Sequence, residues 1–368
     1  MHIESPSALH LAPGPGGDPA RWPSDDRVEH VQAVDPADDA ALHAWYELLR
    51  VAQHVDLPGD PDPCPIRVRE QLRHPWPDQA SRLWLVLDGA RAVAGCLVLL
   101  PTADNRDMAE IELVVHPEFR RRGTGRRLLA QVADQVRAEG RSRIISGVYA
   151  PLDAVDAWTA AGSGPSFARA AGARPVTVEM ERLLEVGSID EAAYDRLLAD
   201  ALAHSPGYST VRWNGPVPEE YAADLAELTG RMSTDTPLDD LAMEPERYDT
   251  GRIRAEEKGL RVRGVRHYTT GAVHDATGRL VGFTELRLAF SHSDHASQEI
   301  TIVGPGHRGH RLGMRMKIEN LRWTRAHEPA LRTVDTWNAD ANGPMIAVNE
   351  AMGFRPHRRA HIWELTLS

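Results

Sequence analysis

The chain has 368 residues and a formal net charge of −11, and 42% of its residues are hydrophobic. The length predicts two domains, and the negative charge disfavours nucleic acid as a partner, because a polyanion requires a basic surface. No apolar run reaches the roughly 18 residues of a membrane helix, no signal peptide is recognisable, and two cysteines are too few for a disulfide framework. We therefore expect a cytoplasmic protein that makes no membrane contact.

The first half begins with a Pro- and Gly-rich stretch, residues 1–26, which predicts a flexible tail. After it, alternating and helical patterns predict an order of strand, helix, three strands, helix and strand, closed by a helix end, a turn and a strand. Asp35, followed by Pro36, is the expected cap of the first helix. We predict that residues 27–185 form an N-terminal domain.

A linker at residues 186–208 contains a helical pattern with Ser188 as its expected cap. The same order of elements then recurs over residues 209–368. Gly125 and Gly313 occupy matching points of the two halves. The sequence therefore predicts a duplicated domain rather than a short-period solenoid.

Each half contains a basic loop between a strand and a helix. In the first half it reads HPEFRRRGTGRRLL, in which Gly123 and Gly125 allow close approach of backbone N–H groups to an anion. The helix start and the surrounding arginines add positive charge. The loop is either a pyrophosphate cradle or a basic helix start on the surface, and its spacing alone does not decide between them.

The spacing Arg120-x-x-Gly123-x-Gly125, after a strand and before a helix, resembles motif A of the GCN5-related N-acetyltransferases (GNAT). The stretch NGPMIAVNEAMGF is similar to motif B of that family. The resemblance implies two domains of an α/β (α+β) fold, each a mixed, mainly antiparallel sheet flanked by helices, in the tandem arrangement also found in mycothiol synthase. It implies acetyl-CoA as the cofactor, held by Val115, Arg120, Arg122, Gly123 and Gly125 in the first half and by Val303, Arg308, Gly309, His310, Arg311, Gly313 and Asn342 in the second.

The two halves differ in how well they match the family. The resemblance implies an Asn eleven residues before a helix-ending Gly, and often a Tyr four residues before it. Gly353 gives Asn342 and Asn349 at these places, whereas Gly172 gives Ala161 and Ala168. The second half, however, has Arg311 where the first has Gly123. We expect catalysis in the C-terminal half, with a structural N-terminal half.

The reaction requires a neutral amine, a base and a donor to the developing oxyanion. By resemblance the donor is a strand N–H group, for which Val303 is our candidate. Glu299 is the candidate base and Glu285 its rival, although either is also explained as an exposed strand carboxylate. We expect Ile300 and Ile302 on one face of the strand and Glu299, Thr301 and Val303 on the other. A gapless comparison pairs Glu299 with Ile111, between Glu110 and Glu112; a bulge in one strand would reconcile their faces.

The segment between the first helix and the hairpin of the second half is acidic. Asp235 and Asp239 in it suit a cationic amine, although a merely solvated loop explains the same residues and is the better interpretation. Trp337 lines the acyl pocket or belongs to the core. His292, Asp294 and His295 suggest a metal site, but a hairpin loop explains them better, and we expect no metal.

The sequence thus predicts an acetyl-CoA-dependent N-acetyltransferase that acts on a small, cationic primary amine, as a monomer or homodimer. The alternatives are a protein or peptide N-acetyltransferase and a non-catalytic acyl-CoA sensor.

Overall fold

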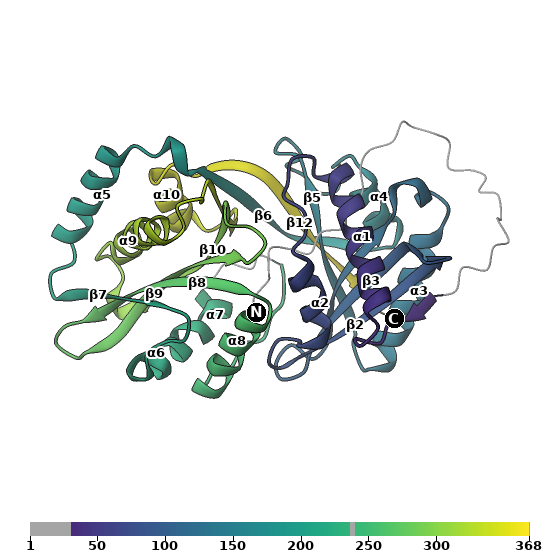
Figure 1. Ribbon diagram of the computed structural model, residues 1–368, viewed down its shortest axis with the longest axis horizontal. Coiled ribbons are helices and arrows are strands. Elements are labelled where there is room, and N and C mark those ends of the chain that lie inside the picture. The colour runs from purple at the N-terminus through teal and green to yellow at the C-terminus, as the bar shows by residue number, and fades with distance from the viewer. Residues whose placement is uncertain (1–30, 236–239, 368) are drawn as a thin grey trace. The chain divides into compact units, whose positions relative to one another are not determined.

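The computed structural model describes residues 31–235 and 240–367 (Figure 1). The chain forms two compact units. The N-terminal unit runs to Glu179 and resumes at Arg358, and the C-terminal unit runs from Met180 to His357. Each unit is a mixed, mainly antiparallel sheet flanked by helices, as predicted from the sequence.

In the N-terminal unit the strand order is β1-β2-β3-β4-β5-β12. Only β4 and β5 run parallel, and the other described pairs are antiparallel. The strands are β1 (Val31–Ala33), β2 (Gln79–Asp88), β3 (Arg91–Pro101), β4 (Met108–Val115), β5 (Arg143–Ala150) and β12 (Arg355–Thr366). The helices are α1 (Asp39–Asp56), α2 (Pro65–Arg73), η1 (Pro117–Phe119), α3 (Thr124–Ala138) and α4 (Ser163–Ala170).

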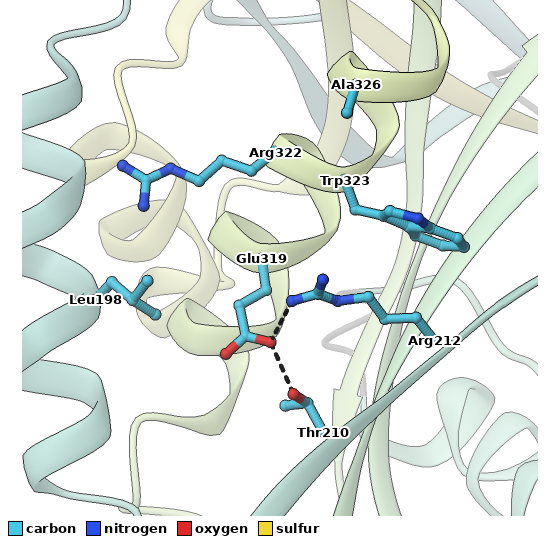
Figure 2. Close-up of a pocket in the computed structure, with 7 residues that line it drawn as sticks. All are labelled: Leu198, Thr210, Arg212, Glu319, Arg322, Trp323 and Ala326. Carbon is cyan, nitrogen blue, oxygen red and sulfur yellow. Dashed lines mark hydrogen bonds and ion pairs between the residues drawn. The ribbon is translucent and has the colours of Figure 1, made fainter.

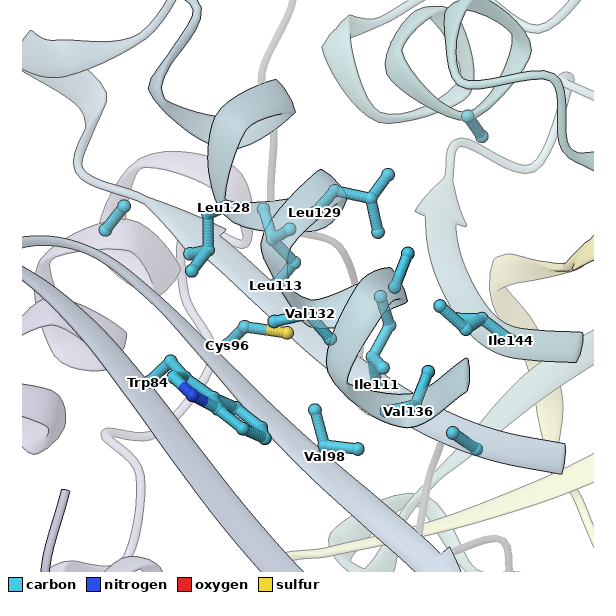
Figure 3. Close-up of a cluster of buried hydrophobic side chains, with 14 of the residues drawn as sticks. Trp84, Cys96, Val98, Ile111, Leu113, Leu128, Leu129, Val132, Val136 and Ile144 are labelled. Carbon is cyan, nitrogen blue, oxygen red and sulfur yellow. The ribbon is translucent and has the colours of Figure 1, made fainter. Parts of the chain in front are cut away.

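Two apolar clusters hold this unit together, one on each face of the sheet. Helix α3 packs Leu128, Val132 and Val136 on strand side chains such as Val98 and Ile111, and Cys96 is buried among them (Figure 3). On the other face α1 and α2 pack against β2 and β3. Burying each such side chain contributes about 1.5–3 kcal/mol, so the two clusters fix which helix covers which face.

In the C-terminal unit the order is β6-β11-β10-β9-β8-β7. Strands β10 and β11 are parallel, whereas the pairs β7–β8, β8–β9 and β9–β10 are antiparallel. The strands are β6 (Arg174–Glu185), β7 (Tyr208–Asn214), β8 (Val265–His274), β9 (Arg279–Ala289), β10 (His295–Val303) and β11 (Thr333–Ala339). The helices are η2 (Val186–Ser188), α5 (Glu191–Ala203), α6 (Glu219–Gly230), α7 (Met232–Asp235), α8 (Thr250–Val262), η3 (Pro305–His307), α9 (Leu312–His327) and α10 (Gly343–Ala351).

The units do not follow one another head to tail along the chain. Strand β6 starts in the N-terminal unit and ends in the C-terminal one, and α5, which we placed in a linker, belongs to the C-terminal unit. In return, the end of β12 pairs with β5, from Arg359 opposite Ala150 to Thr366 opposite Arg143. Each unit therefore takes one strand segment from the other half of the sequence.

Some local expectations were wrong. Asp38, not Asp35, caps α1, because its carboxylate accepts from the N–H groups of Ala40 and Ala41. Asp190, not Ser188, caps α5. Helices α2 and α8 lie in segments that we had not predicted to be helical. Proline at the first position of α2 and a side-chain cap on α8 stabilise them locally.

Helix α9 covers its sheet with an unusually polar face. Asn320 is fully buried and bonds Thr270 and the Tyr268 carbonyl at 2.9 Å each. Lys317 is 1% exposed, and its Nζ lies 5.3 Å from the centre of the Phe354 ring. Burial lowers the pKa of Lys317 to about 7. This amine is therefore neutral in a substantial fraction of the molecules near pH 7.

None of the helices in the described part of the chain is both long enough and apolar enough to cross a membrane.

Candidate functional site

The parallel strand pair of each unit separates partway along its length. In the C-terminal unit β10 and β11 pair up to Gln298 and Thr336, while β10 continues to Val303. In the N-terminal unit β4 and β5 pair up to Glu110 and Ile145. Beyond these residues, the described pairing of the two parallel strands ends in each unit. We call the gap between their facing edges the splay of that unit.

The candidate oxyanion donors point into these splays. The Gly304 N–H donates to the Val281 carbonyl at 2.8 Å, and backbone groups alternate sides along an antiparallel strand, so the Val303 N–H faces away from β9. The Val303 carbonyl accepts from Arg308 Nε at 3.1 Å on that side. Val115 has the same arrangement with Arg120 Nε at 3.0 Å. Both predicted N–H groups thus face the splay.

The first loop (residues 120–125) and the second loop (residues 308–313) share one backbone path. Each has two residues in the left-handed region: Arg121 and Gly123 with φ of 64° and 82°, and Gly309 and Arg311 with φ of 85° and 54°. Gly123 and Arg311 are the N-cap residues of α3 and α9. The two loops therefore follow the same backbone path. Glycine occupies the second left-handed position in the first loop and the first left-handed position in the second loop. Both helix starts present N–H groups that lack helical partners, which fits an anion.

The first arginine of each loop is held by protein groups. Arg120 donates to both carboxylate oxygens of Asp56 at 2.8 and 2.7 Å, and both side chains are nearly buried. Arg308 likewise donates to Asp235 at 2.7 Å, and Asp235 also accepts from Arg231 at 3.1 Å. A predicted cofactor ligand, Arg308, and a predicted substrate residue, Asp235, therefore bond each other.

The two loops differ in their surroundings. Arg122 is exposed at the first loop and lies 5.1 Å above the Phe119 ring. At the second loop the end of α5 contributes acceptors: Asp200 forms an ion pair with Arg311, and the His204 carbonyl lies 3.2 Å from His310 Nδ1. The second loop is thus partly neutralised by the protein itself.

Motif B is present in the C-terminal unit as a helix start. Asn342 is the N-cap residue of α10, but its side chain makes no capping bond. Asn349 is fully buried and donates from Nδ2 to Asn338 Oδ1 at 2.7 Å. In the N-terminal unit the equivalent helix is α4, in which Ala168 is buried in the apolar core.

The candidate bases lie in a charged cluster on the face that α6 and α8 cover. Arg287 donates from Nε to Glu285 Oε1 at 2.5 Å, and Thr269 donates to the other oxygen at 3.3 Å. Burial tends to lower the pKa of Arg287, but the charges of Glu285, Glu299 and Glu256 outweigh it and keep the guanidinium protonated. Three carboxylates therefore act on Arg287, and one of them, Glu256, also pairs with Arg252 at 3.7 Å.

A bulge in β10 places Glu299 in this cluster. The register with β9 shifts between Gln298 and Thr301. Ile300 and Ile302 pack in the cluster on the α6 side, as expected for one face, while Val303 packs toward α9. Because of this shift, strand alternation does not carry from Val303 back to Glu299, whose charge acts on Arg287. The described β3–β4 register has no such shift.

The same face of the N-terminal unit is filled by apolar side chains. Trp45 is 1% exposed and packs with Leu85 and Val114. A Cβ on Gly95 would lie 2.6 Å from the Trp45 ring, so the contact is tight. Glu110 and Glu112 share the face of Val114 by strand alternation.

Two predicted residues of the C-terminal half remain, Trp337 and Asp239. Trp337 is partly buried on β11, two residues after Asp335. His295 and Ser297 bond Asp335 at 2.9 and 2.7 Å. Burial tends to lower the pKa of His295, but the hydrogen bond to Asp335 has the larger combined effect with its charge, and the pKa is raised. Asp239 lies outside the described residues.

Sequence reasoning missed Asp56, Asp200 and the groups that α8 contributes. Asp56 is the last residue of α1 and Asp235 is the last residue of α7. Their shared position at a helix end in the first part of each half could have identified them from the sequence. Nothing in the sequence links Asp200 to Arg311, because the contact depends on how α5 packs on α9.

Comparison with known families gives one model match, the acetyltransferase (GNAT) family, over residues 42–160. Among solved structures, a tandem GNAT protein from the clavulanic acid biosynthesis pathway is 32% identical, and the match covers 92% of this chain and 99% of that one with a TM-score of 0.76. A comparison with curated proteins found no match.

Two further structures share the fold at lower identity. A GCN5-related N-acetyltransferase from Sphaerobacter thermophilus is 17% identical, with coverage of 92% and 95% and a TM-score of 0.59. A GCN5-related glucosamine N-acetyltransferase region of a fungal multi-domain β-N-acetylglucosaminidase is 12% identical, with coverage of 91% and 38% and a TM-score of 0.62.

Proposed function

Because this chain belongs to the GCN5-related N-acetyltransferase family, we propose that it transfers the acetyl group of acetyl-CoA to a primary amine of a small, cationic molecule, with the chemistry in the C-terminal unit. The observation that carries the proposal is the cluster of Glu285, Glu299 and Glu256 near Arg287, in which Glu299 lies on β10, the strand that ends at Val303. Its excess negative charge suits a cationic acceptor.

The contrast between the units supports this choice. The equivalent face of the N-terminal unit is packed with apolar side chains, including Trp45 and Leu85. Glu110 and Glu112 share that face, but Trp45 packs so tightly on it that a Cβ on Gly95 would lie 2.6 Å from its ring. We infer that the N-terminal unit is structural, and that its first loop, with Arg122 exposed, retains the capacity to hold a second acetyl-CoA.

The residues of the C-terminal unit have separate roles in this mechanism. Acetyl-CoA supplies an activated thioester carbonyl when bound. The second loop and the start of α9 hold its pyrophosphate with backbone N–H groups, and Asn342 holds the pantetheine arm. The Val303 N–H donates to the carbonyl oxygen as negative charge develops there.

Glu299 takes the proton from the attacking amine, directly or through water. The C–N bond would form as the C–S bond breaks, so that CoA would leave as a thiolate while the amine proton stays on Glu299, and the thiolate would then take a proton from water. Asn349 is not a proton donor for this step; a thiol with a pKa of about 8.5 is an adequate leaving group without one.

The test of the base compares two carboxylates of one cluster. We expect Glu299→Gln to lower kcat about 10²-fold or more and to remove the acidic limb of its pH profile. Glu285→Gln is the matched control, and its larger effect would make Glu285 the base. An unchanged kcat and pH profile in Glu299→Gln would exclude Glu299.

The test of the active unit uses two matched loop variants. Gly309→Asp and Gly123→Asp each place a carboxylate in a loop at a left-handed glycine with φ of 85° and 82°. We expect only the first variant to abolish turnover against a panel of small amines. The reverse result would place the chemistry in the N-terminal unit. Acetyl-CoA binding without transfer to small amines or to peptides would favour a sensor, and transfer to peptides alone would make a peptide the acceptor.

A further inference from the structure

A pocket opens on the C-terminal unit beside α9, between α5 and the edge strand β7. Its volume is about 610 Å³, and α5, the edge strand β7 and α9 line it (Figure 2). Leu198 of α5 and Trp323 of α9 supply apolar surface. None of its lining residues belongs to the acyl-transfer site described above.

The floor of the pocket is a carboxylate whose charge is fully compensated. Glu319 accepts from Thr210 at 2.7 Å and Arg212 at 2.9 Å through one oxygen, and from Arg315 at 3.1 Å through the other. Burial tends to raise the pKa of Glu319, but these bonds outweigh it and lower it. Glu319 is therefore ionised, and two arginines balance its one charge.

Two guanidinium groups flank this floor from opposite sides. In Figure 2 the Arg212 group lies on the β7 side and the Arg322 group on the α5 side. Within the described residues, Arg212 donates through Nη2 alone, and its acceptor is Glu319. Arg322 also donates through Nη2 alone, and its acceptors are Glu191 and Asp195. The remaining N–H groups of both arginines are available to a ligand.

The charge around the pocket is positive, against the sign of the whole chain. Two arginines line the pocket, and two more bind the same carboxylates; the four are Arg212, Arg322, Arg315 and Arg325. The carboxylates that these arginines pair with are Glu319, Glu191 and Asp195. One positive charge is left over, in a chain whose formal net charge is −11.

We propose that this pocket binds a small organic carboxylate with an aromatic or other apolar body. The planar forks of Arg212 and Arg322 match the two oxygens of a carboxylate. The Trp323 indole and Leu198 pack against the body. The volume lies within the range of about 300–1,000 Å³ that is typical of small-molecule sites. Such a ligand bridges α5 to β7 and α9, so its binding raises the Tm of the chain.

The experiment uses phenylacetate as the probe and its neutral isostere phenylacetamide as the comparison, both titrated into the full-length chain up to about 10 mM with ligand-observed NMR. We expect phenylacetate to bind at least about fivefold more tightly, with the difference falling as salt rises. Equal affinity of the two probes, or no binding of phenylacetate, would overturn the proposal.

Variants locate the binding. Ala326 is an exposed residue of the pocket rim, so its substitution leaves the fold intact. We expect Ala326→Glu to weaken phenylacetate binding about tenfold, with Ala326→Gln as the control for size. Arg212→Gln should weaken it similarly, whereas Arg261→Gln, an exposed arginine of α8, should not. Binding that survives both Ala326→Glu and Arg212→Gln, or an extended peptide on β7 that displaces the probe more strongly than any carboxylate, would refute this site.

Discussion

Arg311 occupies the same left-handed N-cap position in the C-terminal unit that Gly123 occupies in the N-terminal one, with φ of 54° against 82°. The side chain of Arg311 is turned to Asp200, and the backbone path of the second loop is preserved. The duplicated loops therefore differ in side-chain chemistry and local strain rather than in backbone geometry.

The first prediction separates this strain from the ion pair. Arg311→Ala and Arg311→Gly both lose the contact with Asp200, but only glycine relieves the left-handed strain. We expect the glycine variant to be more stable than the alanine variant by about 1 kcal/mol in urea unfolding. Gly123→Ala should lose a similar amount. Equal stability of the two Arg311 variants would show that this position carries no strain.

The second prediction concerns the two aspartates that hold the loop arginines. The side chains of Asp56 and Arg120 are 5% and 11% exposed, whereas Arg308, the partner of Asp235, is 53% exposed. Breaking a buried pair leaves an uncompensated charge, so Asp56→Ala should cost about 3–5 kcal/mol. Asp235→Ala should cost about 1 kcal/mol or less. Similar losses in the two variants would contradict the difference in burial.

The third prediction uses the two lysines of the chain. Lys317 is buried and Lys258 is exposed. Burial lowers the pKa of Lys317 from 10.5 to about 7, so the unfolded chain binds one more proton between these values, and stability rises with pH through that window.

Replacing Lys317 by Met removes this dependence. At pH 7 the variant should be more stable than the parent, by up to about 4 kcal/mol, and the gap should close as the pH approaches 10. Lys258→Met is the control and should leave the pH dependence unchanged. Unfolding curves at pH 7, 8.5 and 10 check this, and a gap that stays constant would mean that Lys317 titrates normally.

The fourth prediction rests on the proposed cofactor site. Asp200 places a negative charge beside Arg311 at the second loop. In a Gly123→Asp background, which disables the first loop, Asp200→Asn should tighten acetyl-CoA binding about threefold in calorimetry. Asp195→Asn is the control, because Asp195 lies on the same helix but pairs with Arg322. Weaker binding in Asp200→Asn would mean that the aspartate positions Arg311 for the phosphate.

The sequence by itself determined the fold of each unit and its duplication. Apolar runs bounded by turns, such as those of β2, β3, β8 and β9, predict strands covered on both faces, and the glycine- and arginine-rich loops mark the same point in both halves. The family was suggested by a resemblance of the motifs around Gly123, Gly125 and Asn342 to known ones, because such motifs are local in the sequence.

Tertiary structure decided which charges meet. The register of β10 with β9 shifts after Gln298, beside Glu299, and no pattern in one strand predicts a shift that depends on its neighbour. The exchange of β6 and β12 segments between units and the pairing of Asp200 with Arg311 likewise join residues far apart in sequence. Periodicity reports which face of an element is apolar, whereas contacts between distant polar groups depend on how the elements pack. That packing placed both the proposed catalytic cluster and the pocket between α5, β7 and α9.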